Sequence, residues 1–265
     1  MEVTYYYRII YLKMKEVFQY RFAFLNNVFA QFFAYMVTFI NITILLQNIH
    51  VLNGWMLNEI LLLWALNVFS YGMAGMFFYN GCNGLEWQIQ GGEMDIFYVQ
   101  PRSIFWNYMF KNISPIFIFH ISFSIVFLVY TLCSLNVRFF FGKLLYFLLL
   151  LFCSICIQAC IMILFASSSF KVIKSGNILS TAIYGLRNFT TYPFSIYGKG
   201  IRLLLTFILP YAFVSYYPAL YALGKIDSLF DMWMIRMEPF ITSMLILMTF
   251  MTWRKGTYAY CGTGT

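Results

Sequence analysis

The chain has 265 residues, of which 62% are hydrophobic and only 10% are charged, and its formal net charge is +8. Soluble globular domains carry about 25% charged residues, so this composition excludes a soluble enzyme, and the high apolar content excludes a disordered chain. A nucleic-acid-binding domain is excluded as well, because the Lys and Arg residues are spread along the sequence and form no basic stripe. The apolar runs are long and continuous, which predicts membrane-spanning helices that satisfy their own backbone hydrogen bonds in lipid.

Residues 5–18 have the pattern of an amphipathic helix that lies in the membrane surface. At helical spacing one face is apolar and the opposite face carries charged side chains. The basic residues of the charged face are Arg8, Lys13 and Lys15. The first residues carry charges throughout and lack a separate apolar core, so no cleavable signal peptide is predicted. The helix is either a simple anchor for the first span or a contact surface.

Four apolar segments follow, and we predict that each crosses the membrane. They comprise residues 22–49, 57–79, 104–134 and 143–166. Each is long enough to cross about 30 Å of hydrocarbon at about 1.5 Å per residue. Pro115 is expected to kink the third segment.

The loop at residues 80–103 is the most informative part of the chain. It holds three of the nine acidic residues, Glu86, Glu93 and Asp95. Its pattern predicts a short helix over 85–89, a break at two glycines, and a second short helix over 93–99. The loop is either a hydrophilic connector or a docking element for a cytoplasmic partner, because exposed aromatic side chains make good interface anchors. The candidate apolar contact patch comprises Trp87, Ile89, Ile96, Phe97 and Tyr98.

The last third of the chain is less regular. The apolar run 176–190 is short for a full span, at about 22 Å as a helix. Residues 201–224 are apolar but are interrupted by Pro210 and Pro218, and we interpret them as a broken, partly inserted hairpin on the outer side, with a seventh span as the alternative. A final span is expected at about 239–253, which gives six spans in all.

The charges indicate an orientation with both termini in the cytoplasm. With six spans, ten of the 17 basic residues lie inside and seven lie outside, Arg187 among them, which is a weak bias in the expected direction. No acid or base is expected at the midplane of a span. This argues against an ion-coupled secondary transporter, which usually needs an ionisable residue there.

No enzymatic motif is present in the sequence. The G-x4-G-K-[ST] loop is absent, so the chain is not expected to hydrolyse ATP by itself, and neither H-E-x-x-H nor G-x-S-x-G occurs. Cys153, Cys156 and Cys160 have a spacing that a metal site could use. However, they lie in an apolar run, and small packing residues of a membrane helix explain them better. We therefore expect no catalytic residues and no metal site.

Four short stretches occur in an order that is typical of one family of membrane proteins. They are residues 87–95 (WQIQGGEMD) with Val99, Pro101 and Arg102; Tyr192, Pro193, Ile196 and Tyr197; residues 209–214 (LPYAFV) with 217–219 (YPA); and residues 253–256 (WRKG) with Tyr260 and Gly262. In sequence, order and spacing they resemble the membrane subunits of ABC-2 type transporters, especially a subgroup of bacterial ABC-2 family permeases. Cys261 departs from the pattern, which usually has Ser or Ala before the final glycine.

The resemblance implies an assembly. Two permease subunits, identical or related, pair in the membrane, and two separate cytoplasmic subunits dock beneath them and bind ATP and Mg. Residues 5–18 would be the connecting helix, 80–103 the cytoplasmic coupling loop, and 190–224 an outer re-entrant segment. The coupling residues would be Trp87, Gly91, Gly92, Glu93, Asp95, Pro101 and Arg102.

Several polar residues within the spans are candidates for a substrate path. They are Asn67, Ser70 and Tyr71 in the second span, and Asn177, Thr181 and Tyr184 in the fifth. The alternative for each is a helix–helix hydrogen bond inside one subunit. The many aromatic and Met side chains suit a hydrophobic, peptide or drug-like substrate.

These observations predict one all-α transmembrane domain over residues 1–265. It has six transmembrane helices, an N-terminal amphipathic interfacial helix, and an outer re-entrant helical segment before the last span. The expected function is that of the permease subunit of an ATP-driven exporter in the cell membrane, in contact with lipid and moving substrate outward through a permease dimer. The alternatives are a membrane receptor or immunity-type binding protein that does not transport, and an ion channel.

Overall fold

The computed structural model describes residues 2–49, 51–171, 185–226 and 228–260. Within these residues the regular elements are all helical, which confirms the predicted all-α class. Five helices are long and apolar enough to cross a membrane. They are Arg21–Gln47, Leu57–Gln90, Phe117–Ser134, Phe141–Phe170 and Leu229–Ala259. They correspond to five of the six predicted spans, and most of the sixth, 176–190, lies outside the described residues.

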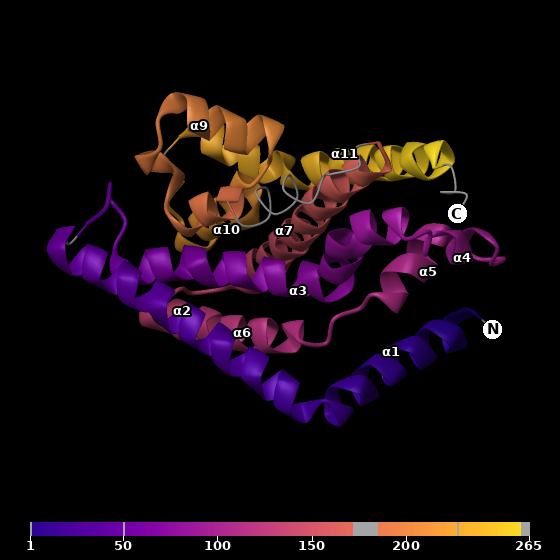
Figure 1. The fold of residues 1–265 in the computed structure, drawn as a ribbon. Coiled ribbons are helices and arrows are strands. Elements are labelled where there is room, and N and C mark those ends of the chain that lie inside the picture. Colours follow the sequence, from indigo (N-terminus) through magenta and orange to yellow (C-terminus); the bar gives the residue numbers. More distant parts are fainter. Residues whose placement is uncertain (1, 50, 172–184, 227, 261–265) are drawn as a thin grey trace.

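The first two helices form a V at the edge of the molecule (Figure 1). Helix α1 covers Glu2–Gln19 and α2 covers Arg21–Ile49, with Tyr20 at the bend between them. Helix α1 turns one side toward the rest of the chain and leaves Tyr7, along with other large side chains, exposed. Since α2 is apolar all round and mostly unburied within this chain, its surface suits lipid or a second subunit.

Helix α3, Leu57–Gln90, is the longest helix and the centre of the bundle. The predicted separate helix over 85–89 is wrong, because the chain continues in α-helical conformation from residue 57 to residue 90. Gly81, which suggested a loop, allows close packing instead, because a Cβ built there would lie 3.0 Å from the Met109 sulfur of α5. Within the predicted span, a Cβ built on Gly75 would lie 2.2 Å from the Phe117 ring of the neighbouring helix, so only a residue without a side chain fits there.

The predicted third span, 104–134, is divided into two helices. Helix α5 covers Ile104–Lys111 and α6 covers Phe117–Ser134, and the short helix α4, Asp95–Tyr98, precedes them. Pro115 lies in the non-helical connection between α5 and α6, so it breaks the helix where a kink was expected. The backbone N–H of Ser114 donates to the carbonyl of Met76 on α3 at 2.9 Å, which satisfies part of this irregular backbone.

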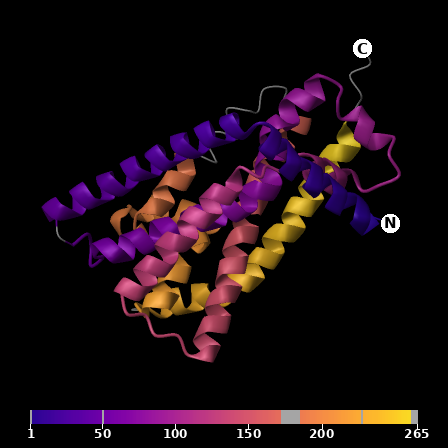
Figure 2. The same cartoon turned by 90° about the horizontal axis from the view of Figure 1, so that it is seen from below.

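Two further long helices complete the bundle. Helix α7, Phe141–Ala166, continues into a short 3-10 turn, η1, Ser167–Phe170, and α11 covers Leu229–Ala259. Figure 2 shows α7 and α11 running side by side. The last span therefore begins about ten residues before the predicted start at 239. Ser228 caps the helix by accepting a hydrogen bond from the backbone N–H of Asp231 at 3.0 Å.

A bent helical segment precedes α11. It contains η3 (Phe189–Thr191), η4 (Phe194–Ile196), α9 (Lys199–Leu203), the π-helical turn η5 (Leu204–Ile208) and α10 (Ala212–Leu223). The α9–η5 segment and α10 meet at 101° around Pro210, a bend that fits either a broken span or a re-entrant hairpin; the segment 190–224 is called the hairpin below. Lys143 Nζ donates to the Ala222 carbonyl at 2.8 Å, and Lys225 Nζ pairs with Glu59 Oε2 at 2.7 Å, so the hairpin is tied to α7 and α3.

The bundle has two distinct ends (Figure 1). Helices α1, α4 and α5 and the last turns of α11 lie at one end, called here the loop end. Helices α9 and α10, with residues 51–56, lie at the other, called the hairpin end. The buried core has a cluster for each end, and the loop-end cluster includes Met94, Phe97, Tyr108 and Trp253.

Candidate functional site

The loop that was predicted to couple the permease to its partner folds as a tight turn at the loop end. The predicted break is present, since α3 ends at Gln90 and Gly91 donates its N–H to the Trp87 carbonyl at 2.8 Å. Gly92 has φ +71°, a left-handed conformation that glycine adopts without strain. The turn reverses the chain and starts α4, with Asp95 in its first turn.

Two apolar side chains fix this loop to the bundle. Met94 is fully buried and Phe97 is 7% exposed. The Phe97 ring meets the Tyr108 ring edge-on at 5.2 Å, and Lys111 Nζ lies 4.8 Å from its centroid. Phe97 is therefore not available to a partner, and its assignment to the exposed contact patch was wrong. It anchors the loop instead.

The loop nevertheless presents apolar surface. Trp87 is 75% exposed, Ile96 54% and Val99 82%, and we call these three residues the exposed patch. Glu93 and Asp95 are also exposed beside them. An exposed tryptophan at the end of a long helix is the kind of side chain that anchors protein interfaces.

The loop is tied to the C-terminal end of α11. Tyr98 donates its hydroxyl to the Thr257 carbonyl at 2.7 Å, and its ring stacks on Tyr260 with centroids 5.2 Å apart. Burial, followed by the proximity of Tyr260 and Asp95, raises the pKa of Tyr98 to about 12, so the phenol stays protonated and remains a donor. An open cavity of about 480 Å³ lies between these two segments.

Helix α1 is attached to the same loop. The guanidinium of Arg102 lies 3.6 Å from the centre of the Tyr5 ring, a close cation–π contact. Tyr5 donates its hydroxyl to Asn107 Oδ1 at 3.1 Å, and the amide of Asn107 donates to Gln100 Oε1 at 2.5 Å. The amphipathic helix therefore contacts both the loop and α5.

The basic face of α1 is largely free. Arg8 and Lys15 are exposed, and Lys13 pairs with Glu16 at 3.0 Å. An exposed pair of this kind contributes little stability. The face is therefore available to lipid headgroups or to a partner. In the loop between α4 and α5, the predicted coupling residue Pro101 is also exposed.

Tyr108 connects the loop to the bundle, and sequence reasoning missed it. Its hydroxyl donates to the Gly81 carbonyl of α3 at 2.7 Å, and its ring lies 6.0 Å from the Trp253 ring of α11. Together with its contact to Phe97, this joins α3, α4, α5 and α11 in one buried cluster. The residue lies within an apolar run, so nothing in the sequence marks it out.

The candidate substrate-path residues on α3 are buried within the chain. Asn67 Nδ2 donates to Thr190 Oγ1 at 2.5 Å, and Ser70 donates to the Leu66 carbonyl at 2.9 Å. Tyr71 borders a cavity of about 330 Å³ between α2, α3 and α6. The candidates on the fifth predicted span, Asn177, Thr181 and Tyr184, lie outside the described residues.

Two charged side chains lie deeper in the bundle than the sequence predicted. The guanidinium of Arg187 lies 3.7 Å from the centre of the Tyr71 ring. Tyr71 is fourteen residues, or about 20 Å, from the start of α3 at Leu57. Glu238 lies within α11 and is fully buried, and neither carboxylate oxygen has a hydrogen-bond partner among the described residues. The prediction of spans without deep charges was wrong, because packing against α3 and α7 sets the depth of these groups.

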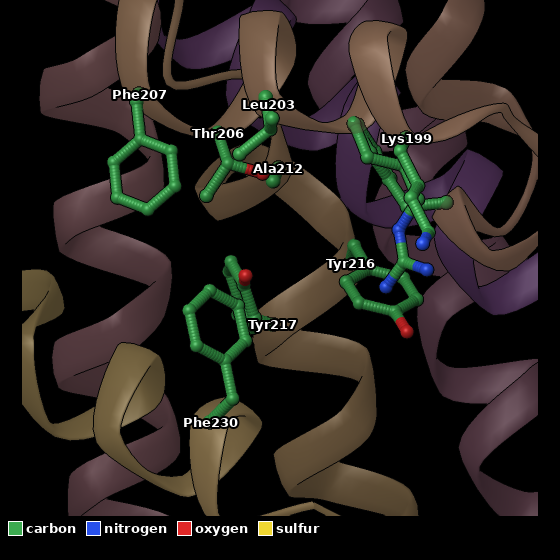
Figure 3. Close-up of a pocket in the computed structure, with 10 residues that line it drawn as sticks. Lys199, Leu203, Thr206, Phe207, Ala212, Tyr216, Tyr217 and Phe230 are labelled. Carbon is green, nitrogen blue, oxygen red and sulfur yellow. The ribbon is translucent and has the colours of Figure 1, made fainter.

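A second pocket, of about 230 Å³, lies at the hairpin end (Figure 3). In Figure 3, Leu203, Thr206 and Phe207 lie on one side and face Tyr217 and Phe230. Lys199 and Arg202 also line it. The pocket combines aromatic rings with two exposed cations. In the described part of the chain, no group of three or more His, Cys, Asp or Glu side chains could hold a metal ion.

Comparison with known proteins gives one match. A family model described as ABC-2 family transporter protein matches residues 32–264, a range that includes the coupling loop, the bent hairpin and α11. No curated protein and no solved structure matches the chain.

Proposed function

This chain belongs to the ABC-2 family of transporter proteins, and from that premise we propose that it is the permease subunit of an ATP-driven exporter. The family comprises membrane subunits, whereas the ATPase is a separate protein. The chain works with two ATP-binding subunits that hold ATP and Mg, and it pairs with a second permease, identical or related.

The exposed patch on the anchored loop carries this proposal. Trp87 projects from the last turn of α3, and Ile96 and Val99 project from the segment after the glycine break, where Met94 and Phe97 are buried in the loop-end core. A flexible connector would leave all its apolar groups free to move. A helix end with an exposed tryptophan, followed by an anchored loop with two exposed carboxylates, suits a docking surface for a soluble subunit.

The same anchors would transmit movement. When ATP binding closes the soluble subunits, they displace the patch, and the displacement reaches α5 through the Phe97–Tyr108 contact. Tyr108 passes it to α3 through Gly81 and to α11 through Trp253. Tightly packed side chains of this kind shift as a unit instead of deforming continuously.

The orientation follows from the docking role. Because soluble ATP-binding subunits are cytoplasmic, the loop end faces the cytoplasm, and so do α1 and the end of α11. Basic residues near the ends of these helices, Arg8, Lys15, Arg254 and Lys255 among them, agree with the positive-inside rule. The hairpin end then faces outward, and residues 190–224 dip into the outer leaflet without crossing it.

The test is reconstitution. The purified chain, its ATP-binding subunit and the second permease are placed in liposomes, and vanadate-sensitive ATP hydrolysis is measured. We expect hydrolysis coupled to movement of a hydrophobic dye or peptide into inside-out vesicles, and expect it to require this chain. Ionic current without ATP in a planar bilayer would identify a channel. Stable substrate binding with no net movement would identify a receptor or immunity-type binding protein.

A further inference from the structure

We propose that the cavity bordered by α2, α3 and α6 binds the anionic headgroup of a membrane amphiphile, a carboxylate or a phosphate, with Arg187 as its counter-ion. That such an amphiphile is cargo rests on the proposed function, whereas the binding site itself does not. The cavity has a volume of about 330 Å³, which is large enough for a headgroup and too small for a whole lipid or peptide.

Among the described residues, Arg187 forms no salt bridge with a carboxylate. Its Nε donates to Asn67 Oδ1 at 3.0 Å, and its guanidinium stacks on Tyr71. The salt bridges among the described residues are Lys13–Glu16 and Lys225–Glu59, and neither includes Arg187.

The undescribed segment next to Arg187 in the sequence adds no acidic residue. Residues 172–184, which precede the described stretch around Arg187, contain no Asp or Glu. A guanidinium held deep in a membrane bundle is costly unless it is paired. An anion that enters the cavity would supply the missing partner.

The rest of the cavity lining suits the same ligand. Gln31, Asn80 and Ser114 contribute amide and hydroxyl donors, and none of the lining residues is acidic. The N-terminal end of α6 also borders the cavity through Phe117. A helix N-terminus carries partial positive charge, so it adds to the potential that Arg187 creates.

The position of the cavity favours an amphiphile over a free ion. It reaches from Tyr71, near the middle of α3, to Asn80, which is about 35 Å along the helix in its loop-end half. Asn80 is exposed, so the cavity opens toward that side of the membrane. Phe117, Ile116 and Tyr79 contribute apolar atoms to the lining. A headgroup can therefore enter from the loop-end leaflet while its tail stays in lipid.

Binding of defined probes to the purified full-length chain tests the proposal. In a nonionic detergent, dodecyl phosphate is titrated and binding is followed by calorimetry, with dodecanol and inorganic phosphate as the two half-probes. We expect dodecyl phosphate to bind and both half-probes to bind at least about tenfold more weakly, since a charged hydrogen bond is lost with the first and the tail with the second. Equal binding of dodecanol would overturn the role of charge. Equal binding of inorganic phosphate would overturn the amphiphile.

Variants assign the charge to one residue. Arg187→Gln should weaken dodecyl phosphate binding by at least about tenfold. Arg187→Lys keeps the charge but loses the planar group that stacks on Tyr71, so it should bind with an affinity between those of the wild type and Arg187→Gln. Arg202→Gln, at the hairpin end, should leave it unchanged. If Arg187→Gln does not fold, Gln31→Leu provides the second variant, because it removes a donor from the partly buried lining, and it should weaken binding several-fold. Undiminished binding in the folded variants would overturn the proposal.

A separate readout distinguishes this inference from the proposed function. Coupled ATP hydrolysis with no binding of dodecyl phosphate would overturn the site and leave the permease role intact. Binding that depends on Arg187, in a chain with which no ATP-binding subunit associates, would support the site and remove the permease role.

Discussion

The sharpest prediction concerns Trp87. We expect Trp87→Ala to leave the fold unchanged and to uncouple ATP hydrolysis from transport. The side chain is 75% exposed, so truncating it leaves no buried cavity. It projects beside α4, where the ATP-binding subunit is proposed to dock.

The size of the effect follows from the exposed area. With about 150 Å² of side-chain surface available, burial against a partner is worth at most about 4 kcal/mol at about 25 cal/mol/Å². Truncation of a central interface tryptophan typically costs about 2 kcal/mol or more. We therefore expect the affinity for the ATP-binding subunit to fall at least about thirty-fold.

The assay compares three variants. Affinity is measured by titrating the ATP-binding subunit onto the purified chain, and stability by thermal unfolding in detergent. Trp233→Ala is the matched control, because Trp233 is 52% exposed at the hairpin end, and it should change neither quantity. Phe97→Ala, which empties a buried site, should lower stability by about 3–5 kcal/mol. The reasoning is refuted if Trp87→Ala binds normally, or if Trp87→Ala and Phe97→Ala lose the same stability.

Three further predictions follow from particular contacts. Gly75→Val should lower the melting temperature, since a Cβ there overlaps the facing ring of α6 and overpacking costs about 1–3 kcal/mol; an unchanged melting temperature would mean that α6 lies farther from α3. Tyr98→Phe should remove the hydrogen bond to Thr257 and weaken coupling by about 1 kcal/mol. In the wild type, coupling should not change between about pH 6 and 9, because the pKa of the Tyr98 phenol is about 12 and the hydroxyl stays protonated. A loss of wild-type coupling within this pH range would contradict the assignment. Lys225→Met should leave Glu59 unpaired near the hairpin end and lower stability by about 1–2 kcal/mol, whereas Lys225→Arg should restore it.

The sequence predicted the class of fold because composition alone decides it. A chain with so few charges must bury its backbone polar groups in helices, and three of the expected spans start within two residues of their predicted positions. Helix ends were harder to predict. Gly81 and Gly84 looked like loop residues, but both lie within α3. In a membrane bundle glycine does not end a helix, and Gly81 permits close contact with α5.

The functional residues divide in the same way. The exposure of Trp87 and the break at the glycines were predicted from a local pattern of turn residues and aromatics, whereas the coupling role of Trp87 stays a prediction. Tyr108, Arg187 and Glu238 were not, because their roles depend on which distant helices they meet. The depth of Arg187 is set by Asn67 and the Tyr71 ring, more than a hundred residues earlier in the chain, and local hydropathy contains no information about such contacts.

The attachment of the loop to both α1 and α11 has a consequence for biosynthesis. Tyr98 is held by Thr257 in the last helix, and Arg102 is held by Tyr5 in the first. During translation the first helix and the loop emerge long before the last one. The surface that we propose for docking is therefore complete only when α11 has been inserted. A truncated or half-inserted chain would offer a loosely held loop, so recruitment of the ATP-binding subunit would itself select for finished permeases.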